Sequence, residues 1–348
     1  MIKVLVIDDS AVMRGFLGRV VGAQPDMELL GVASDPLIAI DRIRRSPPDV
    51  ITLDVEMPRM NGLDFLRKLM ALRPIPVVMV SSLTREGADA TVRALELGAV
   101  DFFPKPSSFE GLDAVGAEIA EKIRTASQAR VGRRSPVPAD SGPAPLQPSG
   151  ALAPARAGTI VAVGASTGGV EALRRILPKL PVAMPPIVVA QHMLPGFTQS
   201  FAARLDALCA LRVQEAQDGQ PAQAGHVYIA PGGRHLVVTR RGDGYRLRLT
   251  DDAPVNRHRP SVDTLFRSVG EAAGAGATAV MLTGMGADGA SAMLALRRRG
   301  AMTFAQDEAS SVVFGMPRQA IALGGVQEVL PLDDIAARLQ AACLRTAS

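Results

Sequence analysis

Three aspartates near the start of the chain have the residue type and the positions that suit a divalent cation and a phosphoryl group. Asp8 and Asp9 directly follow the apolar run Ile2 to Ile7, and Asp54 follows the run Val50 to Leu53. If both runs are parallel strands, their carboxyl ends meet at one edge of a sheet and gather the three carboxylates. Magnesium prefers oxygen ligands, and it would offset the repulsion between an acidic pocket and an incoming phosphoryl anion. These residues therefore predict a magnesium site at which a carboxylate can accept a phosphoryl group.

Two further polar residues are expected at the same edge. Ser81 follows the apolar run Val77 to Val80, and Lys105 follows the run Val100 to Phe103. Their hydroxyl and ammonium groups can each bond a phosphoryl oxygen. Any one of these residues alone is more often a turn cap or a solvated loop residue. Their occurrence at four strand ends favours the functional interpretation.

A serine later in the chain lies in a sequence that suits nucleophilic attack on an acyl carbon. The segment Gly164-Ala165-Ser166-Thr167-Gly168 matches the G-x-S-x-G nucleophile elbow, between a predicted strand and a helix that begins near Val170. The match alone is weak evidence, because a glycine-rich loop between a strand and a helix can also bind phosphate on its backbone N–H groups. The choice between a nucleophile and a phosphate-binding loop depends on which residues lie near the serine.

Two residues at other predicted strand ends can complete a catalytic triad with Ser166. His192 follows the apolar run Ile187 to Ala190, and Asp288 lies just beyond the run Thr278 to Leu282. A lone histidine is usually structural, and an aspartate in this position is often a helix N-cap. Three converging strand ends favour the triad, in which His192 takes the serine proton and Asp288 orients the imidazole ring.

Backbone N–H groups near the serine are predicted to form an oxyanion hole. The N–H of Thr167 directly follows the nucleophile, and the glycine-rich loop around Met285 can add a second donor. His258 lies before a helix that Ser261 is expected to cap, which favours a structural or substrate-positioning role over that of a general base. The chain order Ser, His, Asp differs from the Ser, Asp, His order of α/β-hydrolases and argues against that fold.

The elements that must position the acidic cluster alternate short apolar runs with helix-length stretches. Five runs are expected to be strands: Ile2–Ile7, Leu29–Ala33, Val50–Leu53, Val77–Val80 and Val100–Phe103. Continuous apolar runs suit strands that are covered on both faces, and alternation with helices predicts a parallel, doubly wound α/β sheet. We expect this unit to span residues 1–124.

Residues 125–157 are expected to be a linker, because the periodicity stops there and prolines are frequent. Residues 158–348 are predicted to form a second doubly wound, mainly parallel α/β unit. Its buried strands include Thr159–Val163, Ile187–Ala190 and Thr278–Leu282. The run Val227 to Leu249 contains the turn Gly242-Asp243-Gly244 and predicts an antiparallel hairpin inserted into this sheet or added at its edge.

Composition excludes several classes of protein. The 348 residues carry a net charge of only +4, with no Trp and two Tyr, so a nucleic-acid platform is not expected. The first ten residues reach an acidic pair too early for a signal peptide, and no apolar run has the roughly 18 residues that span a bilayer. Cys209 and Cys343 are expected to be unpaired core thiols. A soluble cytoplasmic protein without membrane insertion is the expectation.

Residues 1–124 resemble the receiver domain of two-component response regulators. The resemblance implies that Asp54 is the phosphoacceptor and that Asp8 and Asp9, with Asp54, bind magnesium. It also implies that Ser81 is the switch hydroxyl, that Lys105 contacts the phosphoryl group and that a histidine kinase is the phosphodonor.

The whole chain resembles the chemotaxis protein-glutamate methylesterases, the CheB family. The resemblance rests on G-A-S-T-G-G around Ser166, Q-H-M at 191–193, R-H-R-P-S-V-D at 257–263 and T-G-M-G-A-D-G at 283–289. It implies a triad of Ser166, His192 and Asp288 that needs no cofactor. The implied substrates are methylated glutamates of transmembrane chemoreceptors, which are hydrolysed to glutamate and methanol, and many members also deamidate receptor glutamine.

Three alternatives and one hypothesis on regulation accompany this interpretation. The receiver could be fused to a non-catalytic interaction module, or the chain could be a dedicated glutamine deamidase, which differs only in its leaving group. A DNA-binding regulator would need a basic recognition helix, and the second unit offers none. We expect the unphosphorylated receiver to pack over the edge bearing Ser166, and phosphorylation of Asp54 to favour an arrangement that exposes it.

Overall fold

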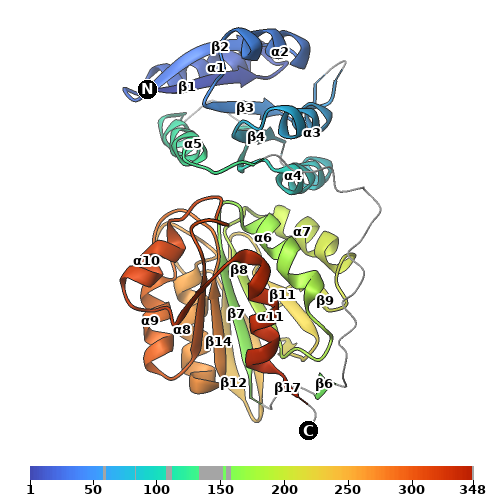
Figure 1. Cartoon of the computed structure of the whole chain (residues 1–348), viewed down its shortest axis with the longest axis vertical. Coiled ribbons are helices and arrows are strands. Elements are labelled where there is room, and N and C mark those ends of the chain that lie inside the picture. The colour runs from blue at the N-terminus through green and yellow to red at the C-terminus, as the bar shows by residue number, and fades with distance from the viewer. Residues whose placement is uncertain (58–59, 83, 107–111, 133–151, 154–157, 347–348) are drawn as a thin grey trace. The chain divides into compact units, whose positions relative to one another are not determined.

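The computed structural model describes the chain except for residues 58–59, 83, 107–111, 133–151, 154–157 and 347–348. The chain divides into two compact units, Met1–Ala139 and Asp140–Ser348. Figure 1 shows the first in blue to teal and the second in green to red. The predicted domain limits at residues 124 and 158 stay predictions, although the last helix of the first unit continues to Ser127.

The first unit is the predicted five-stranded parallel sheet, with strand order β2-β1-β3-β4-β5. The strands are β1 (Ile2–Ile7), β2 (Met27–Ala33), β3 (Val50–Asp54), β4 (Val77–Ser81) and β5 (Asp101–Pro104). The helices are α1 (Ala11–Gly22), α2 (Pro36–Arg45), α3 (Gly62–Leu72), α4 (Arg85–Leu97) and α5 (Leu112–Ser127). All five residues of β3 and of β4 are buried, as expected for strands covered by helices on both faces.

Local signals in the sequence set where the helices of this unit begin. The side chains of Ser10, Asp35, Asn61 and Thr84 each accept a backbone N–H from the first turn of the helix that follows. Such caps satisfy donors that have no partner inside the helix. The loops between strand ends and helices are thereby kept short, which holds Asp8 and Asp9 at the edge of the sheet.

The second unit is built on a seven-stranded parallel sheet with the order β16-β15-β14-β7-β8-β11-β9. Its strands are β7 (Ile160–Ala165), β8 (Ile187–Gln191), β9 (Arg212–Glu215), β11 (His226–Ile229), β14 (Ala277–Met281), β15 (Met302–Gln306) and β16 (Glu328–Leu330). Its helices are α6 (Gly169–Ile176), α7 (Phe197–Asp206), α8 (Val262–Ala273), α9 (Ala290–Arg298), α10 (Met316–Ala322) and α11 (Leu332–Cys343), with short 3₁₀ helices at Leu177–Lys179 and Gly274–Gly276. Figure 1 shows α6 and α11 on one side of the sheet and α8, α9 and α10 on the other.

This strand order creates a switch point at the centre of the sheet. In the sheet, β8, β11 and β9 lie in that order on one side of β7, and β14, β15 and β16 lie in that order on the other side. In doubly wound sheets, ligands bind at the carboxyl edge beside such a reversal. The loops that follow β7 and β14 therefore lie where a site is expected.

The predicted hairpin exists, but its predicted place was wrong. β12 (His235–Arg241) and β13 (Gly244–Thr250) pair with β10 (Pro221–Ala222) in a separate antiparallel sheet, while His226–Ile229 is a parallel strand of the main sheet. The reason is the packing partner. Leu236, Val238, Tyr245 and Leu247 are buried in one hydrophobic cluster with residues of α8, so the hairpin is covered by a helix instead of pairing with the main sheet.

Three further findings concern the termini, the membrane and the thiols. The pair β6 (Leu152–Ala153) and β17 (Arg345–Thr346) joins a short piece of the predicted linker to the end of the chain. Among the described residues, no helix has the length and apolar character needed to cross a bilayer. Cys209 and Cys343 are unpaired, and burial raises the pKa of the Cys209 thiol to about 12 and that of Cys343 to about 11.

Candidate functional site

The acidic cluster of the first unit forms as the sequence indicated. Carboxylate oxygens of Asp8, Asp9 and Asp54 all lie within 4.8 Å of one another. Asp8 and Asp54 are buried, and Asp9 is exposed. The Nζ atom of Lys105 lies 2.7 Å from Oδ2 of Asp54 and 3.8 Å from Oδ2 of Asp8. The site therefore combines three clustered carboxylates with one ammonium group.

Burial changes the ionisation of two of these carboxylates, Asp8 and Asp54. Burial, together with the charge of Asp54, raises the pKa of Asp8 from 3.8 to about 6. Burial also raises the pKa of Asp54, although the hydrogen bond and charge of Lys105 oppose the shift. Oδ2 of Asp8 is buried and has no hydrogen-bond partner within the described residues. A hard divalent cation would supply the missing partner and neutralise the cluster, so these residues fit magnesium.

The predicted switch hydroxyl points to a neighbouring helix in this structure. Ser81 is fully buried, and its Oγ donates to the carbonyl of Gly87 at 3.1 Å. The hydroxyl of Thr91 donates to Ser81 Oγ at 2.6 Å. Both partners belong to α4, which ties the serine to that helix. The roles of Ser81 and Lys105 toward a phosphoryl group stay predictions.

We expect Asp8→Asn to raise the melting temperature by roughly 5 °C in magnesium-free buffer at pH 8. The pKa of Asp8 lies above its ordinary value, so its ionised form destabilises the fold, and this loss of stability develops as the pH rises through about 4 to about 6. The same substitution removes a predicted magnesium ligand, so the melting temperature of the variant should not rise when magnesium is added. Thermal unfolding with and without magnesium measures both effects, and a magnesium response equal to that of the wild type would contradict the assignment.

The second constellation lies at the carboxyl edge of the seven-stranded sheet. Ser166 follows β7, and His192 follows the neighbouring strand β8, where the His192 N–H donates to the Ala165 carbonyl at 3.1 Å. Asp288 comes from the loop after β14, the strand that adjoins β7 on its other side. The three predicted residues thus come from three adjacent strands of one sheet.

The turn at Ser166 is held tightly by its neighbours. Its N–H donates to the carbonyl of Thr283 at 3.0 Å, and its carbonyl accepts from the amide of Gln191 at 2.9 Å. Gly168 has a φ of 80°, which favours glycine, and a Cβ atom there would lie 2.6 Å from Cβ of Val312. The glycine therefore satisfies both the turn and the close approach of the loop that contains Val312.

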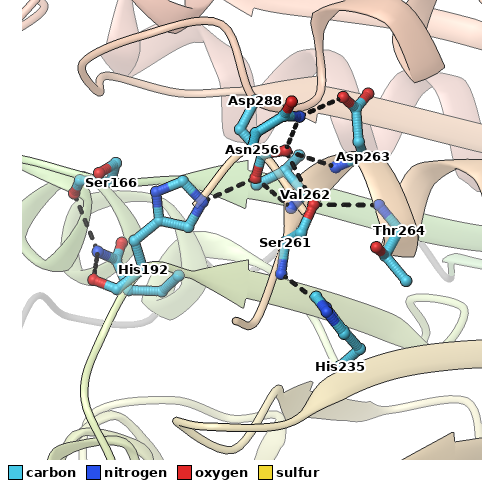
Figure 2. A network of polar contacts seen from close by, with 10 residues as sticks. Ser166, His192, His235, Asn256, Ser261, Val262, Asp263, Thr264 and Asp288 are labelled. Carbon is cyan, nitrogen blue, oxygen red and sulfur yellow. Dashed lines mark hydrogen bonds and ion pairs between the residues drawn. The ribbon is translucent and has the colours of Figure 1, made fainter. Parts of the chain in front are cut away.

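His192 and Asp288 form the contact expected of a base and its orienting carboxylate. Nε2 of His192 lies 2.8 Å from Oδ2 of Asp288, as Figure 2 shows. The other ring nitrogen, Nδ1, is on the side of the ring that faces Ser166, and it is buried without a hydrogen-bond partner among the described residues. No hydrogen bond joins Ser166 to His192 in this structure. The roles of the three residues in catalysis stay predictions.

Asp288 accepts several hydrogen bonds in addition to that of His192. Oδ1 accepts from the Asn256 amide at 2.8 Å and from the Ser261 hydroxyl at 2.8 Å. The N–H groups of Val262 and Asp263 donate at 2.6 and 3.2 Å. Burial alone would raise the pKa of Asp288, but the hydrogen bond to His192 and the charge of that ring, helped by these donors, hold it below its usual range. The carboxylate is therefore kept ionised.

The α8 and α9 helices bind each other's first turns through carboxylates. Asp288, just before α9, accepts N–H groups at the start of α8, and Asp263 in α8 accepts the N–H of Ala292 in α9 at 2.9 Å. The amide of Asn256 donates to both carboxylates, at 2.7 Å to Asp263 and 2.8 Å to Asp288. The positive ends of two helix dipoles thus favour the negative charges. The N-cap of α8 is Ser261, as predicted, and its hydroxyl accepts the N–H of Thr264 at 3.3 Å; the N-cap of α9 is Gly289, so Asp288 is not the N-cap of either helix.

The predicted oxyanion residues lie in the two loops that flank the serine. Thr167 is buried, and its carbonyl accepts from the Thr283 hydroxyl at 3.0 Å. Met285 follows Gly284, where an added Cβ would lie 2.7 Å from Cβ of Ser166. The loop of Met285 therefore passes close to the serine. Whether the two N–H groups donate to an oxyanion stays a prediction.

Sequence reasoning missed several residues that hold this site in place. Asn256, Asp263 and Gln191 contact the predicted residues or their loops. Gln191 precedes His192 directly, and an amide next to a candidate base is one signal that could have indicated a positioning role. The roles of Asn256 and Asp263 had no local signal, because they depend on how α8 and α9 pack.

Comparisons with known proteins relate both units to described families. Residues 161–339 match the family described as CheB methylesterase, and residues 4–115 match the family described as response regulator receiver domain. A protein of Bordetella pertussis named protein-glutamate methylesterase/protein-glutamine glutaminase is 57% identical over 341 residues, covering 97% of this chain and 96% of the relative. A relative with the same name from Salmonella choleraesuis is 53% identical over 342 residues, covering 98% and 96%.

A solved structure corresponds to the second unit. The crystal structure of the Thermotoga maritima CheB methylesterase catalytic domain is 41% identical, with a TM-score of 0.53. The match covers 54% of this chain and 100% of that domain.

Proposed function

Because this chain belongs to the CheB methylesterase family and carries a response regulator receiver domain, we propose that it is a phosphorylation-controlled protein-glutamate methylesterase that also deamidates protein glutamine. The names of relatives that are 57% and 53% identical over nearly the whole chain support both activities. The single observation that carries the mechanism is the His192–Asp288 hydrogen bond, with the second ring nitrogen directed to the side of Ser166.

The first chemical step is attack by Ser166 on the ester carbonyl of a methylated glutamate. Rotation of the Ser166 side chain brings Oγ to Nδ1 of His192, which takes the hydroxyl proton as the oxygen bonds to the carbon. Hydrogen bonds between a nucleophile and its base are often long before substrate binds. Asp288 accepts from Nε2–H and stabilises the imidazolium that forms. The N–H groups of Thr167 and Met285 are proposed to stabilise the oxyanion.

The second step releases methanol and regenerates the enzyme. The imidazolium of His192 returns its proton to the methoxy oxygen, so that methanol leaves and a glutamyl ester of Ser166 remains. A water molecule then gives a proton to His192 and attacks the same carbon, and Ser166 leaves with that proton. The net reaction is ester plus water to glutamate, methanol and a proton. With a glutamine substrate, ammonia leaves in place of methanol when the imidazolium returns its proton, and the other steps are the same.

The receiver site is proposed to control this chemistry. Asp54 is the proposed phosphoacceptor, and Asp8, Asp9 and Asp54 are the residues that would hold magnesium. When bound, the cation would reduce the repulsion between these carboxylates and the incoming phosphoryl group. Lys105 neutralises negative charge at the same place, and Ser81 is proposed to turn from Gly87 toward the phosphoryl oxygens.

The proposed partners follow from the same two families. The phosphodonor is a chemotaxis histidine kinase, and the substrates are methyl-accepting chemoreceptors. A location in the cytoplasm stays a prediction of the sequence. The direct test is methanol release from membranes that contain methylated receptors. Release at the background rate, with correctly folded protein and accessible receptors, would eliminate the esterase function.

Regulation leads to a prediction of its own. We expect the fragment that begins at Gly158 to release methanol faster than the unphosphorylated full-length chain, because the receiver is proposed to lower activity until Asp54 is phosphorylated. A phosphodonor should raise the rate of the full-length chain and leave that of Asp54→Asn unchanged. The catalytic domain of the Thermotoga maritima relative has been crystallised by itself, which supports the use of this fragment. A fragment no faster than the unphosphorylated chain would disprove inhibition by the receiver.

A further inference from the structure

We propose that His258 is a positioning residue that fixes the plane of the His192 ring, an inference that rests on the proposed esterase function. The two rings are stacked, with centroids 3.7 Å apart and planes inclined by 13°. His192 is bonded at Nε2 to Asp288, while Nδ1 has no partner among the residues described. One hydrogen bond at one corner does not stop the ring from turning about its Cβ–Cγ bond. A second aromatic ring that lies flat against it does stop this rotation.

The plane of the ring matters because Nδ1 must face the serine. A turn about Cβ–Cγ moves Nδ1 out of the direction of Ser166 even while Nε2 stays close to Asp288. General base catalysis requires hydrogen-bond reach and alignment, and a misplacement of about 1 Å can reduce the rate about 10²-fold. The stacked ring therefore acts on the orientation of the base, without contact with the reacting atoms.

His258 is presented by a tight turn with unusual backbone geometry. The N–H of His258 donates to the Val255 carbonyl at 2.9 Å, and the N–H of Val255 donates to the His258 carbonyl at 3.1 Å. The two residues between them, Asn256 and Arg257, have φ values of 52° and 66°. Positive φ at both central residues is the pattern of a type I′ turn, which usually carries Asn or Gly. Arginine in the second position costs on the order of 1 kcal/mol, and such strain persists only where the surroundings fix it.

The turn is anchored to the site on both sides of His258. Asn256 donates to Asp288 and Asp263, as shown in Figure 2. Arg259 donates through Nη1 to the backbone carbonyl of Asp251 at 2.9 Å, and its own carbonyl accepts from Gly233. The turn thus contacts both the proposed base and its carboxylate partner, since Asn256 donates to Asp288 and the ring of His258 stacks on His192. A rigid support of this kind is what a positioning residue requires.

Two substitutions at position 258 separate stacking from other roles. We expect His258→Ala to lower kcat for methanol release about 10- to 100-fold with KM changed less than about twofold, because substrate binding does not depend on the ring plane. His258→Phe keeps a flat ring and should recover kcat to within about threefold of the wild type. The matched control is His226→Ala, which removes a histidine from the amino end of β11, where it stacks on Tyr228, and should leave kcat unchanged.

A second measurement does not depend on turnover. The Nε2–H proton of His192, bonded to Asp288, should give a downfield proton NMR signal that is absent from His192→Ala. His258→Ala should broaden or remove this signal, and His258→Phe should retain it. An unchanged signal and kcat in His258→Ala would overturn the proposal, and so would loss in both variants, because a flat ring would then be insufficient. A wild type that releases no methanol would defeat the proposed function, while the NMR comparison would still decide the role of His258.

Discussion

Replacing Ser166 with alanine should reduce methanol release from methylated receptors by a factor on the order of 10⁵ or more. The alanine has no oxygen to attack the ester, although Thr283 and Gln191 can still hold the backbone of the turn. Only binding and oxyanion stabilisation would remain, and they leave a small residual rate. The measurement is the initial rate of methanol release with full-length protein.

Two controls accompany this substitution. Phosphorylation of Asp54 should proceed at the wild-type rate, because Asp54 belongs to the other compact unit. The matched control is Ser200→Ala, which removes the hydroxyl of a buried serine in α7 and should leave the rate nearly unchanged. If Ser166→Ala still released methanol at the wild-type rate, Ser166 would not be the nucleophile. The alternative of a receiver fused to a non-catalytic module would then be favoured.

Replacing Asp288 with asparagine should lower kcat about 10⁴-fold. Oδ2 of Asp288 accepts from Nε2 of His192, which fixes the tautomer with the lone pair on Nδ1. An amide can donate to Nε2, which favours the opposite tautomer, and it carries no charge to stabilise the imidazolium. Stability should also fall, because the carboxylate accepts N–H groups of Val262 and Asp263 at the start of α8.

The loss of stability can be separated from the loss of chemistry by a second variant. Asp263→Asn perturbs the reciprocal contact with α9, where Asp263 accepts from Ala292 and Ser291, without touching His192. We expect the two variants to lower the melting temperature by similar amounts, and Asp263→Asn to lower kcat by no more than about tenfold. Equal losses of kcat in both would indicate that Asp288 acts only by holding the helices together.

The folds of both units could be predicted because their signals are local. Apolar runs of four to six residues mark buried strands, and alternation with helices implies parallel order, so residues directly after those runs share one edge. This reasoning placed Asp8, Asp54 and Lys105 together, and it placed His192 beside Asp288. The place of the hairpin was predicted wrongly because its two strands pair with each other in the same way whether they join the main sheet or pack on α8.

The sequence by itself thus determined the two parallel sheets and the strand ends at which the reactive residues lie, because strand period and loop position are properties of adjacent residues. Only the tertiary structure decided how those residues are oriented. The stacking of His258 on His192 and the hydrogen bond from Asn256 to Asp288 join segments roughly 30 to 65 residues apart. Such contacts depend on how α8 and α9 pack against the sheet, and no local pattern in the sequence records that packing.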